Sequence, residues 1–406
     1  MERETFIVLR DRNLGLRTTR PSFGGGPGDG VFGMRGGLEV PPAPQIDVEQ
    51  MEEREAAEMA REPDVVGLAR TMPIKLIQPT AASGDTDVSG AQSAGVTWGV
   101  RAVGADTSSF DGAGVTVGVL DTGIDDQHPA FAGMTLTRRD FTGSGDQDAN
   151  GHGTHCAGTI FGRDVDGIRI GVAPGVEHAL IGKVLDNEGR GSTDMLAQAM
   201  LWLSQEGAQV VSMSLGFDFP GFAERLQQQG FPALLATSIA LEGYRMNLRL
   251  FDTLMSHLRA QAAFSGGAVV VAASGNESRR DQHPNFEVSA SVPAAANDVI
   301  SVGALEQGSA GLKVATFSNS NPILVAPGVG VVSAKTGGGL VALSGTSMAC
   351  PHVAGVAALW WQAVKGGNAP LGLRAVETNL QSRATTSGLA SGTPPAQRGM
   401  GLVRTP

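Results

Sequence analysis

Short apolar runs alternate with helical patterns from residue 96 to the end of the chain. Val115–Leu120 and Ala268–Ala273 are apolar at consecutive positions, which is typical of strands buried on both faces of a parallel sheet. Further strands are expected at Ala179–Val184, Gln209–Met213 and Val299–Val302, and helices at His152–Ile160, Thr193–Gln205, Asn247–Phe264, Thr346–Ala363 and Leu371–Leu380. Strands separated by helices predict a doubly wound α/β domain over 96–406, with a mostly parallel central sheet flanked by helices.

Residues 1–80 follow a different pattern, which predicts a small α+β region. Thr5–Leu9 is expected to form a strand, Val48–Arg61 an exposed helix, and Pro63–Leu68 a strand that continues through Ile74 to Leu76. Residues 20–44 are rich in glycine and proline and predict a loop. Residues 81–95, rich in small and polar residues, predict a linker in which processing would occur.

Composition limits which partners the protein can bind and in which compartment we expect it. The formal net charge of −10 argues against nucleic acid and against anionic membranes as partners. No apolar run approaches the roughly 18 residues that span a bilayer, and the N-terminus lacks the pattern of a signal peptide. Two cysteines, Cys156 and Cys350, do not make a disulfide framework. These features predict a cytoplasmic protein with reduced thiols.

Polar residues suited to catalysis stand at the ends of predicted elements. Ser347 begins a helix of small apolar residues, where free N–H groups and the helix dipole stabilise a developing anion. Pro351 is expected in the opening turn of this helix. Asp121 ends a buried strand, and His152 lies at the mouth of a second small-residue helix. A helix cap would explain Ser347 alone, but Asp, His and Ser in this chain order match the subtilisin triad.

Four motifs extend this match, and with them the chain resembles the subtilases, a family of serine proteases. The motifs are V-L-D-T-G-I-D at 119–125, N-G-H-G-T-H-C-A-G at 150–158, A-A-S-G-N-E at 272–277 and G-T-S-M-A-C-P-H-V-A-G at 345–355. The resemblance implies a serine endopeptidase with Ser347 as nucleophile, His152 as its base and Asp121 orienting the imidazole. It also implies that the Asn276 amide and the Ser347 N–H bind the oxyanion of the tetrahedral intermediate.

The resemblance further assigns a substrate cleft. Its walls are the backbone segments Ser214-Leu215-Gly216 and Gly189-Arg190-Gly191, with Ser274 and Gly275 leading to the oxyanion asparagine. A peptide held between strand edges is bound through its main chain, which predicts broad specificity. Ser291 and Glu277 map to the primary pocket, but the longer loop between Asn276 and Val292 leaves the preferred residue open.

The N-terminal region loosely resembles subtilase propeptides, which act as folding chaperones and inhibitors with their tail in the cleft. This implies a zymogen cut between about Ile74 and Gln92, although an accessory domain that is never removed stays an alternative. Ala130 replaces an aspartate of the family's tight calcium site, so that site is degraded. Asp146 and Asp148 are weak candidates for another calcium site, and solvated loop acids are the simpler interpretation. No cofactor is expected for the chemistry.

Three other functions compete with this one. Asp121-Thr122-Gly123 is also an aspartic-protease signature, but that mechanism needs a second copy, which the chain lacks. A thiol protease using Cys156 or Cys350 would need a base of its own. A catalytically silent subtilase that binds peptides is the alternative outside the enzymes.

Residues 217–245 form an insertion relative to the subtilase pattern. Its apolar residues predict two helices, Glu224–Gln229 and Ala233–Leu241, with Gly230 and Pro232 between them. The insertion is expected to be either a lid or partner surface at the edge of the cleft, or a decoration packed on the neighbouring helix.

Overall fold

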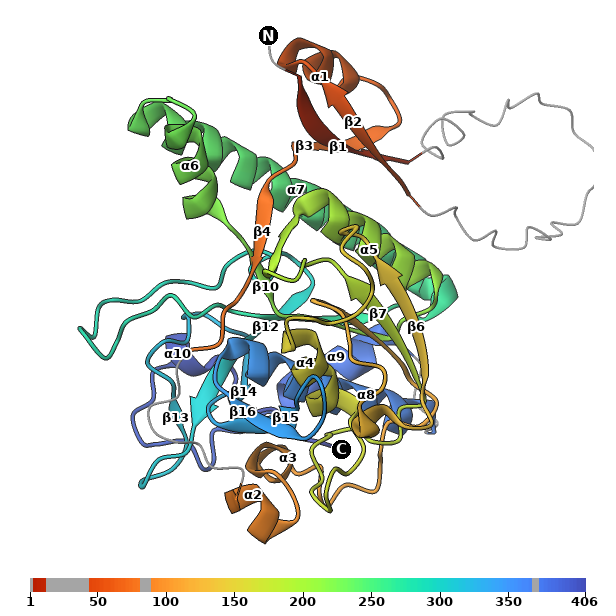
Figure 1. The fold of residues 1–406 in the computed structure, drawn as a ribbon, viewed down its shortest axis with the longest axis vertical. Coiled ribbons are helices and arrows are strands. Elements are labelled where there is room, and N and C mark those ends of the chain that lie inside the picture. The colour runs from red at the N-terminus through yellow and green to blue at the C-terminus, as the bar shows by residue number, and fades with distance from the viewer. Residues whose placement is uncertain (1–2, 12–43, 81–88, 367–371) are drawn as a thin grey trace, which may run out of the picture.

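The parallel sheet predicted from the apolar runs is present. The computed structural model describes residues 3–11, 44–80, 89–366 and 372–406 (Figure 1), so residues 20–43 of the expected loop and 81–88 of the expected linker lie outside it. The strand order is β13-β12-β11-β9-β5-β7-β6, with β14 also paired to β12, and only the β12–β13 pairing is antiparallel. The bounds are β5 Thr116–Asp121, β6 Thr135–Asp140, β7 His178–Lys183, β9 Val210–Met213, β11 Val269–Ala273, β12 Val299–Glu306, β13 Lys313–Val314 and β14 Leu324–Pro327.

Alternate residues of the central strands enter two different cores, which explains why these runs are apolar at every position. In β11, Val269 and Val271 pack into the core shared with α4 (His152–Phe161) and α8 (Thr346–Lys365). Val270 and Ala272 pack into the opposite core, shared with α5 (Thr193–Gln205) and α7 (Ala233–Ser265). The remaining elements of this domain are α2 Ser89–Ala94, α3 Trp98–Val103, the 3-10 helix η1 Pro129–Phe131, the hairpin β15 Val331–Ala334 with β16 Leu340–Leu343, α9 Leu373–Ser382 and α10 Pro395–Arg398. The doubly wound α/β fold is confirmed.

The N-terminal region forms a separate antiparallel sheet with order β2-β1-β3 (Figure 1). Its elements are β1 Glu4–Arg10, β2 Gln45–Met51, α1 Glu53–Met59 and β3 Val65–Arg70. The expected helix at Val48–Arg61 is therefore wrong over its first turn, because Val48 pairs with Ile7 as part of a strand. Glu55 accepts a hydrogen bond from the Glu52 N–H, which marks the true start of the helix.

Residues of β1 join this small sheet to the larger α/β domain. Phe6 and Val8 pack against α1, whereas Ile7 and Leu9 face the other way and share a core with α7. Asn247 of α7 donates a hydrogen bond of 2.7 Å to the Arg70 carbonyl. The N-terminal sheet is thus docked on one of the long helices that cover the central sheet.

The chain changes sheets after Arg70, so the expectation of one strand from Pro63 through Leu76 is wrong. β4 (Pro73–Leu76) joins a different sheet, between β10 (Leu215–Phe217) and β8 (Arg190–Ser192). Pro73 has no N–H and therefore suits the first position of a strand. Just before it, the Met72 N–H is bonded to the Thr193 hydroxyl, which ties the crossing to the start of α5.

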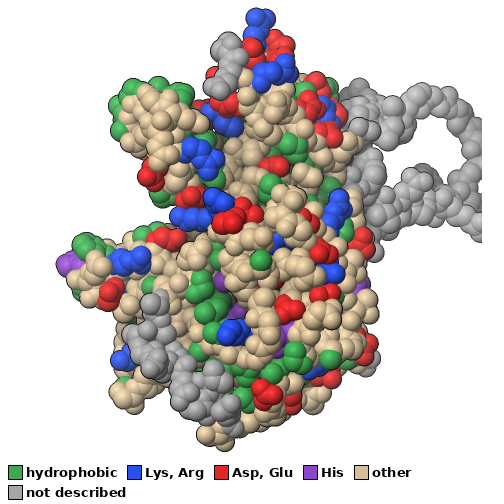
Figure 2. Space-filling view, in the orientation of Figure 1, with side chains coloured by type: hydrophobic (Ala, Val, Ile, Leu, Met, Phe, Trp, Pro, Cys, Tyr) green, Lys and Arg blue, Asp and Glu red, His purple; other side chains and the backbone are tan. Residues whose placement is uncertain are grey.

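The insertion at 217–245 is helical, as predicted. Its helices are α6 (Phe219–Gln228) and the first part of α7, which continues without a break through the helix expected at Asn247–Phe264. Phe217 and Phe219 contact the ring of Tyr244 edge-on, which holds the base of the insertion together. The remainder of the insertion projects from the α/β domain and exposes apolar side chains, green in Figure 2. Control of substrate access by this insertion remains a hypothesis.

Candidate active site

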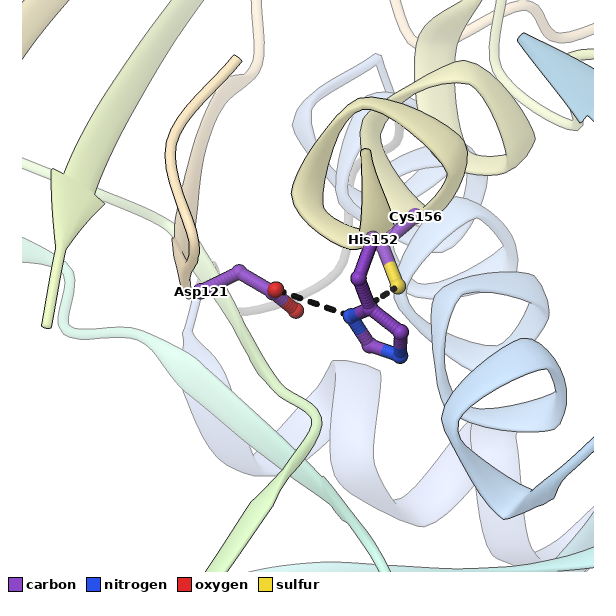
Figure 3. A group of neighbouring side chains, drawn as sticks. All are labelled: Asp121, His152 and Cys156. Carbon is purple, nitrogen blue, oxygen red and sulfur yellow. Dashed lines mark hydrogen bonds and ion pairs between the residues drawn. The ribbon is translucent and has the colours of Figure 1, made fainter. Parts of the chain in front are cut away.

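Asp121 and His152 are brought together in the interior, as their motifs imply. The His152 Nδ1 atom lies 2.8 Å from Asp121 Oδ1, and both side chains are almost completely buried (Figure 3). The Thr122 N–H donates a second hydrogen bond to the same carboxylate oxygen. These two hydrogen bonds hold the carboxylate in place, so that it can accept a hydrogen bond from a proton-bearing Nδ1 and orient the imidazole.

The approach of α4 to the end of β5 depends on Gly153. A Cβ at Gly153 would lie 2.2 Å from the Gly123 carbonyl oxygen, closer than atoms can come. The first turn of α4 is also tied to this loop by Asp148, whose carboxylate accepts hydrogen bonds from Thr122 and Thr154. Glycine at 153 and the buried carboxylate of Asp148 therefore set the distance between His152 and Asp121.

Ser347 is fully buried in the first turn of α8, close to the N-terminal region of the same chain. Its Oγ donates a hydrogen bond of 2.9 Å to the carbonyl oxygen of Ile77. The Nε2 atom of His152 is buried and has no hydrogen-bond partner among the described residues. In this arrangement the Ser347 hydroxyl is hydrogen-bonded to a peptide carbonyl of its own chain. The imidazole nitrogen that would accept the hydroxyl proton has no hydrogen-bond partner among the described residues.

Pro351 lies one turn deeper in α8 than expected, since the helix starts at Thr346. Proline has no N–H, so the carbonyl of Ser347, four residues earlier, has no partner within the helix. The Ser214 hydroxyl, at 3.2 Å, and the Cys156 thiol, at 3.4 Å, donate to it instead. Because of the proline, the backbone of Ser347 is hydrogen-bonded to Ser214 and to α4, the helix that carries His152.

Asn276 has its amide fixed in one orientation. Its Oδ1 accepts hydrogen bonds of 2.9 Å from both the N–H and the hydroxyl of Thr346. Its Nδ2 is therefore directed outward and donates to the carbonyl oxygen of Gln78, also at 2.9 Å. Thr346 was not singled out in the sequence, although its place beside the nucleophile in the G-T-S motif was a signal for such a role.

β4 lies between the two predicted cleft walls and pairs with both of them. The register places Leu76 opposite Leu215 and Lys75 opposite Gly216 on one side, and Ile74 opposite Gly191 on the other. At the end of the strand, the Leu76 N–H bonds to the Gly189 carbonyl at 2.8 Å, and just beyond it the Ile77 N–H bonds to the Ser214 carbonyl at 3.3 Å. A segment of the chain thus lies in the cleft as an added strand.

The other residues assigned to substrate binding lie near Thr346, Asn319 or Gly216. Gly275 has a φ of 112°, which favours glycine, and its N–H bonds to the Thr346 hydroxyl. Ser274 is fully buried beside it, and its carbonyl accepts a hydrogen bond from Asn319. Glu277 also bonds to Asn319, at 2.7 Å. Ser291 faces Gly216, where a Cβ would lie 3.2 Å from the serine hydroxyl.

Neither cysteine is suited to act as a nucleophile. Burial raises the pKa of the Cys156 thiol well above its usual value, with the Asp121 carboxylate adding to the effect. Burial likewise raises the pKa of Cys350 to about 12. Both thiols are therefore protonated at neutral pH, which counts against the thiol-protease alternative. Burial also lowers the pKa of His155 to about 3 and that of His352 to about 4, so both are neutral core histidines.

In the part of the chain that the structure describes, potential metal ligands cluster at the site itself. Among the described residues, Asp121, His152 and Cys156 form the one group of three such side chains whose ligand atoms lie close together. Asp146 is paired with Arg138 at 3.4 Å, and the Asp148 oxygens accept hydrogen bonds from neighbouring N–H and O–H groups. The suggestion that Asp146 and Asp148 bind calcium gains no support from these contacts and remains a hypothesis.

Modification of Cys156 should inhibit catalysis. Its Sγ lies 3.7 Å from His152 Nδ1 on the same face of α4 (Figure 3), so a bulky mercurial on the sulfur would displace the imidazole. We expect loss of activity that follows mercurial incorporation, measured by mass spectrometry and peptide hydrolysis, whereas Cys156→Ala should resist. Full activity with Cys156 demonstrably modified would contradict the prediction.

Comparison with known proteins identifies the family of the chain. The class defined by the fold and site is an α/β hydrolytic domain that holds a buried Asp–His pair and a serine in the first turn of a helix. Residues 112–401 match the model of the subtilase family. The chain belongs to the subtilase family of serine proteases.

Relatives of the chain are named as serine proteases or as a subtilisin. An intracellular serine protease of Paenibacillus polymyxa is 33% identical over 68% of this chain and 74% of its own length. Subtilisin BL of Lederbergia lenta is 35% identical over 60% of this chain and 73% of its own length. A cuticle-degrading serine protease of Arthrobotrys oligospora is 34% identical over 61% of this chain, which spans only 49% of that relative. Within the described residues, no helix is both long and apolar enough to cross a membrane.

Proposed function

We propose that this subtilase is an endopeptidase that cleaves peptide bonds through an acyl-enzyme on Ser347. The serine Oγ attacks the scissile carbonyl carbon while its proton passes to His152 Nε2. Asp121, bonded to Nδ1, stabilises the imidazolium that results. The imidazolium then gives the proton to the departing amine, and water activated by the same nitrogen hydrolyses the ester.

The negative charge that develops on the carbonyl oxygen would be held by two donors. These are the Nδ2 of Asn276, whose orientation is fixed by Thr346, and the N–H of Ser347 at the start of α8. Donors held in place before the reaction need no reorganisation, and removing one such donor costs about 10²–10³ in turnover.

The observation that carries the proposal is the position of residues 73–78. Their main chain is bound by both cleft walls, the Ile77 carbonyl oxygen lies 2.9 Å from Ser347 Oγ, and the next carbonyl meets Asn276. A peptide substrate bound in the same way would present its carbonyl to the nucleophile. We propose that the N-terminal region serves as chaperone and intramolecular inhibitor, and that the bond cut to release it is Ile77–Gln78.

The same contacts explain how the segment would inhibit. The Asn276 amide is bonded to the Gln78 carbonyl, one residue beyond the carbonyl that faces Ser347. Attack on Ile77 would require this amide to move to the Ile77 oxygen. Until it does, the segment occupies the cleft without the full set of donors that catalysis needs.

No metal or cofactor is proposed for the chemistry. The methyl group of Ala130 offers no oxygen to a cation at the position where the family's tight calcium site has a carboxylate, so the residues present do not fit that site. We also propose the cytoplasm as the compartment, supported by the name of the Paenibacillus polymyxa relative and by two free thiols.

The test is labelling of the full chain with a fluorophosphonate, as purified and after incubation. We expect one adduct, on Ser347, that appears as the N-terminal region is released, together with a new N-terminus at Gln78. Release without labelling, or labelling at another residue, would overturn the triad assignment. An intact chain that labels and hydrolyses peptides would leave the enzyme in place and overturn the zymogen. Failure to label or hydrolyse would favour a silent peptide-binding subtilase.

A further inference from the structure

The side chains of β4 alternate between the body of the protein and the outside. Ile74 and Leu76 are almost completely buried, whereas the side chain of Lys75 between them is 44% exposed. Successive strand residues point to opposite faces, so a peptide bound in the place of β4 would present every second side chain outward. Lys75 is the outward residue two positions before Ile77. Its contacts therefore show which groups of the protein would meet the corresponding side chain of a bound peptide.

Lys75 is paired with Asp218, the residue at which the insertion leaves the cleft wall. The Lys75 Nζ atom lies 2.8 Å from Asp218 Oδ1, and the side chain of Asp218 is only 20% exposed. The Asp218 N–H also bonds to the carbonyl of Pro73, so Asp218 contacts the cleft segment through both backbone and side chain.

The carboxylate of Asp218 is held in place independently of Lys75. It caps α6 by accepting a hydrogen bond from the Gly221 N–H. It also lies directly over Gly221, where a Cβ would be 2.0 Å from its Oδ2. A carboxylate fixed by the helix it caps loses little entropy when it binds a cation, which favours its use as a recognition group.

The charges around Lys75 have an acidic excess. Arg190 stands opposite Lys75 on β8 and would repel it, but Arg190 is paired with Asp186 and Glu188, at 3.5 and 3.1 Å. Together with Asp218, three carboxylates and one guanidinium thus belong to the ion pairs around Lys75 and Arg190. Figure 2 shows acidic and basic side chains gathered where β4 passes below the projecting α6.

We propose that Asp218 selects substrates with a lysine or arginine two residues before the residue whose carbonyl faces Ser347. The proposal rests on the function proposed above and names its substrate class: peptides of the form apolar–basic–apolar–aliphatic, as in Ile74-Lys75-Leu76-Ile77. The insertion then contributes to the cleft through Asp218 at its base, whatever the role of its projecting tip.

The test compares two chromogenic peptides, Ac-Ile-Lys-Leu-Ile and Ac-Ile-Glu-Leu-Ile p-nitroanilides, hydrolysed by the full chain after incubation. We expect kcat/KM to favour the lysine peptide by about two- to fivefold, the range of partly exposed ion pairs, and the preference to shrink in high salt. Asp218→Asn keeps a capping residue and should remove the preference, and Asp218→Lys should reverse it. Glu224→Gln, an exposed acid of the same helix, is the matched control and should leave it unchanged.

A second measurement does not depend on catalysis. In full-length Ser347→Ala, amide hydrogen exchange of residues 74–77 should be faster in Lys75→Glu and in Asp218→Lys, and slow again when the two are combined. Equal hydrolysis of both peptides, or a preference that survives Asp218→Asn, would overturn the specificity proposal while endopeptidase activity stands. If no peptide is hydrolysed, the proposed function fails. Exchange that the combined variant does not restore would then overturn the pairing as well.

Discussion

Ser347→Ala should reduce peptide hydrolysis by about 10⁶ in turnover, the loss that follows removal of the serine in subtilisin, a member of the same family. The physical reason is that the nucleophilic oxygen is gone, while the cleft and the oxyanion donors are retained. Only the residual rate from binding and oxyanion stabilisation should persist. The measurement is kcat for a chromogenic peptide against the wild-type full chain.

The same variant reports on the N-terminal region. If the chain cuts itself, Ser347→Ala should stay at full length, with Ile77 and Gln78 still in the cleft, when it is purified away from wild-type enzyme. Ser387→Ala, at an exposed serine near the C-terminus, should behave like wild type. Normal trimming of Ser347→Ala would show that another protease makes the cut, and unchanged hydrolysis would remove Ser347 from the mechanism.

Asp121→Asn should lower kcat by about 10⁴ with little change in KM, as the corresponding loss does in serine proteases with this triad. Asp121 Oδ1 lies 2.8 Å from His152 Nδ1 in a buried site, so its charge is weakly screened there. An asparagine has no charge to stabilise the imidazolium, and its amide can donate to Nδ1 and favour the unproductive tautomer. The Thr122 N–H would still find an acceptor, so the fold should be retained.

A matched control separates this effect from a general loss of acidic charge. Asp126 lies five residues further along and is paired with Arg138 at 3.2 Å, outside the contacts of His152. Asp126→Asn should therefore keep kcat within a few-fold of wild type, with thermal unfolding of both variants measured in parallel. Loss of turnover by Asp126→Asn to the same extent would show that Asp121 acts through charge or stability and not through His152.

Local patterns predicted the central strands β5, β7, β9, β11 and β12, because each carries its own apolar signal, but they did not predict β6, β13 and β14 of the same sheet. The continuous apolar runs of β5, β9 and β11 predicted strands covered on both faces, and the two cores meet alternate residues of those runs. The prediction was weaker where polar alternation competed with helix propensity. Residues 48–51 were expected in a helix, but pairing with β1 made them a strand.

Contacts between distant segments were beyond the reach of any local pattern. The pairing of Lys75 with Asp218 and the hydrogen bond from Ser347 to Ile77 join residues more than a hundred positions apart. Thr346 and Ser214 gained roles for the same reason, since one fixes the Asn276 amide and the other satisfies a carbonyl that Pro351 leaves free.

The sequence by itself therefore determined the fold class, the family and the residues proposed for the chemistry, because motifs at strand and helix ends are encoded by neighbouring residues. The resemblance implied that the tail of the N-terminal region lies in the cleft, but only the tertiary structure decided that β4 is the strand that fills it, that the Ile77 carbonyl just beyond β4 meets Ser347, and that the insertion places a carboxylate beside β4. These positions depend on the packing of β1 against α7, which fixes where the chain runs after Arg70. Such a position is the sum of many long-range contacts, and no single stretch of sequence carries it.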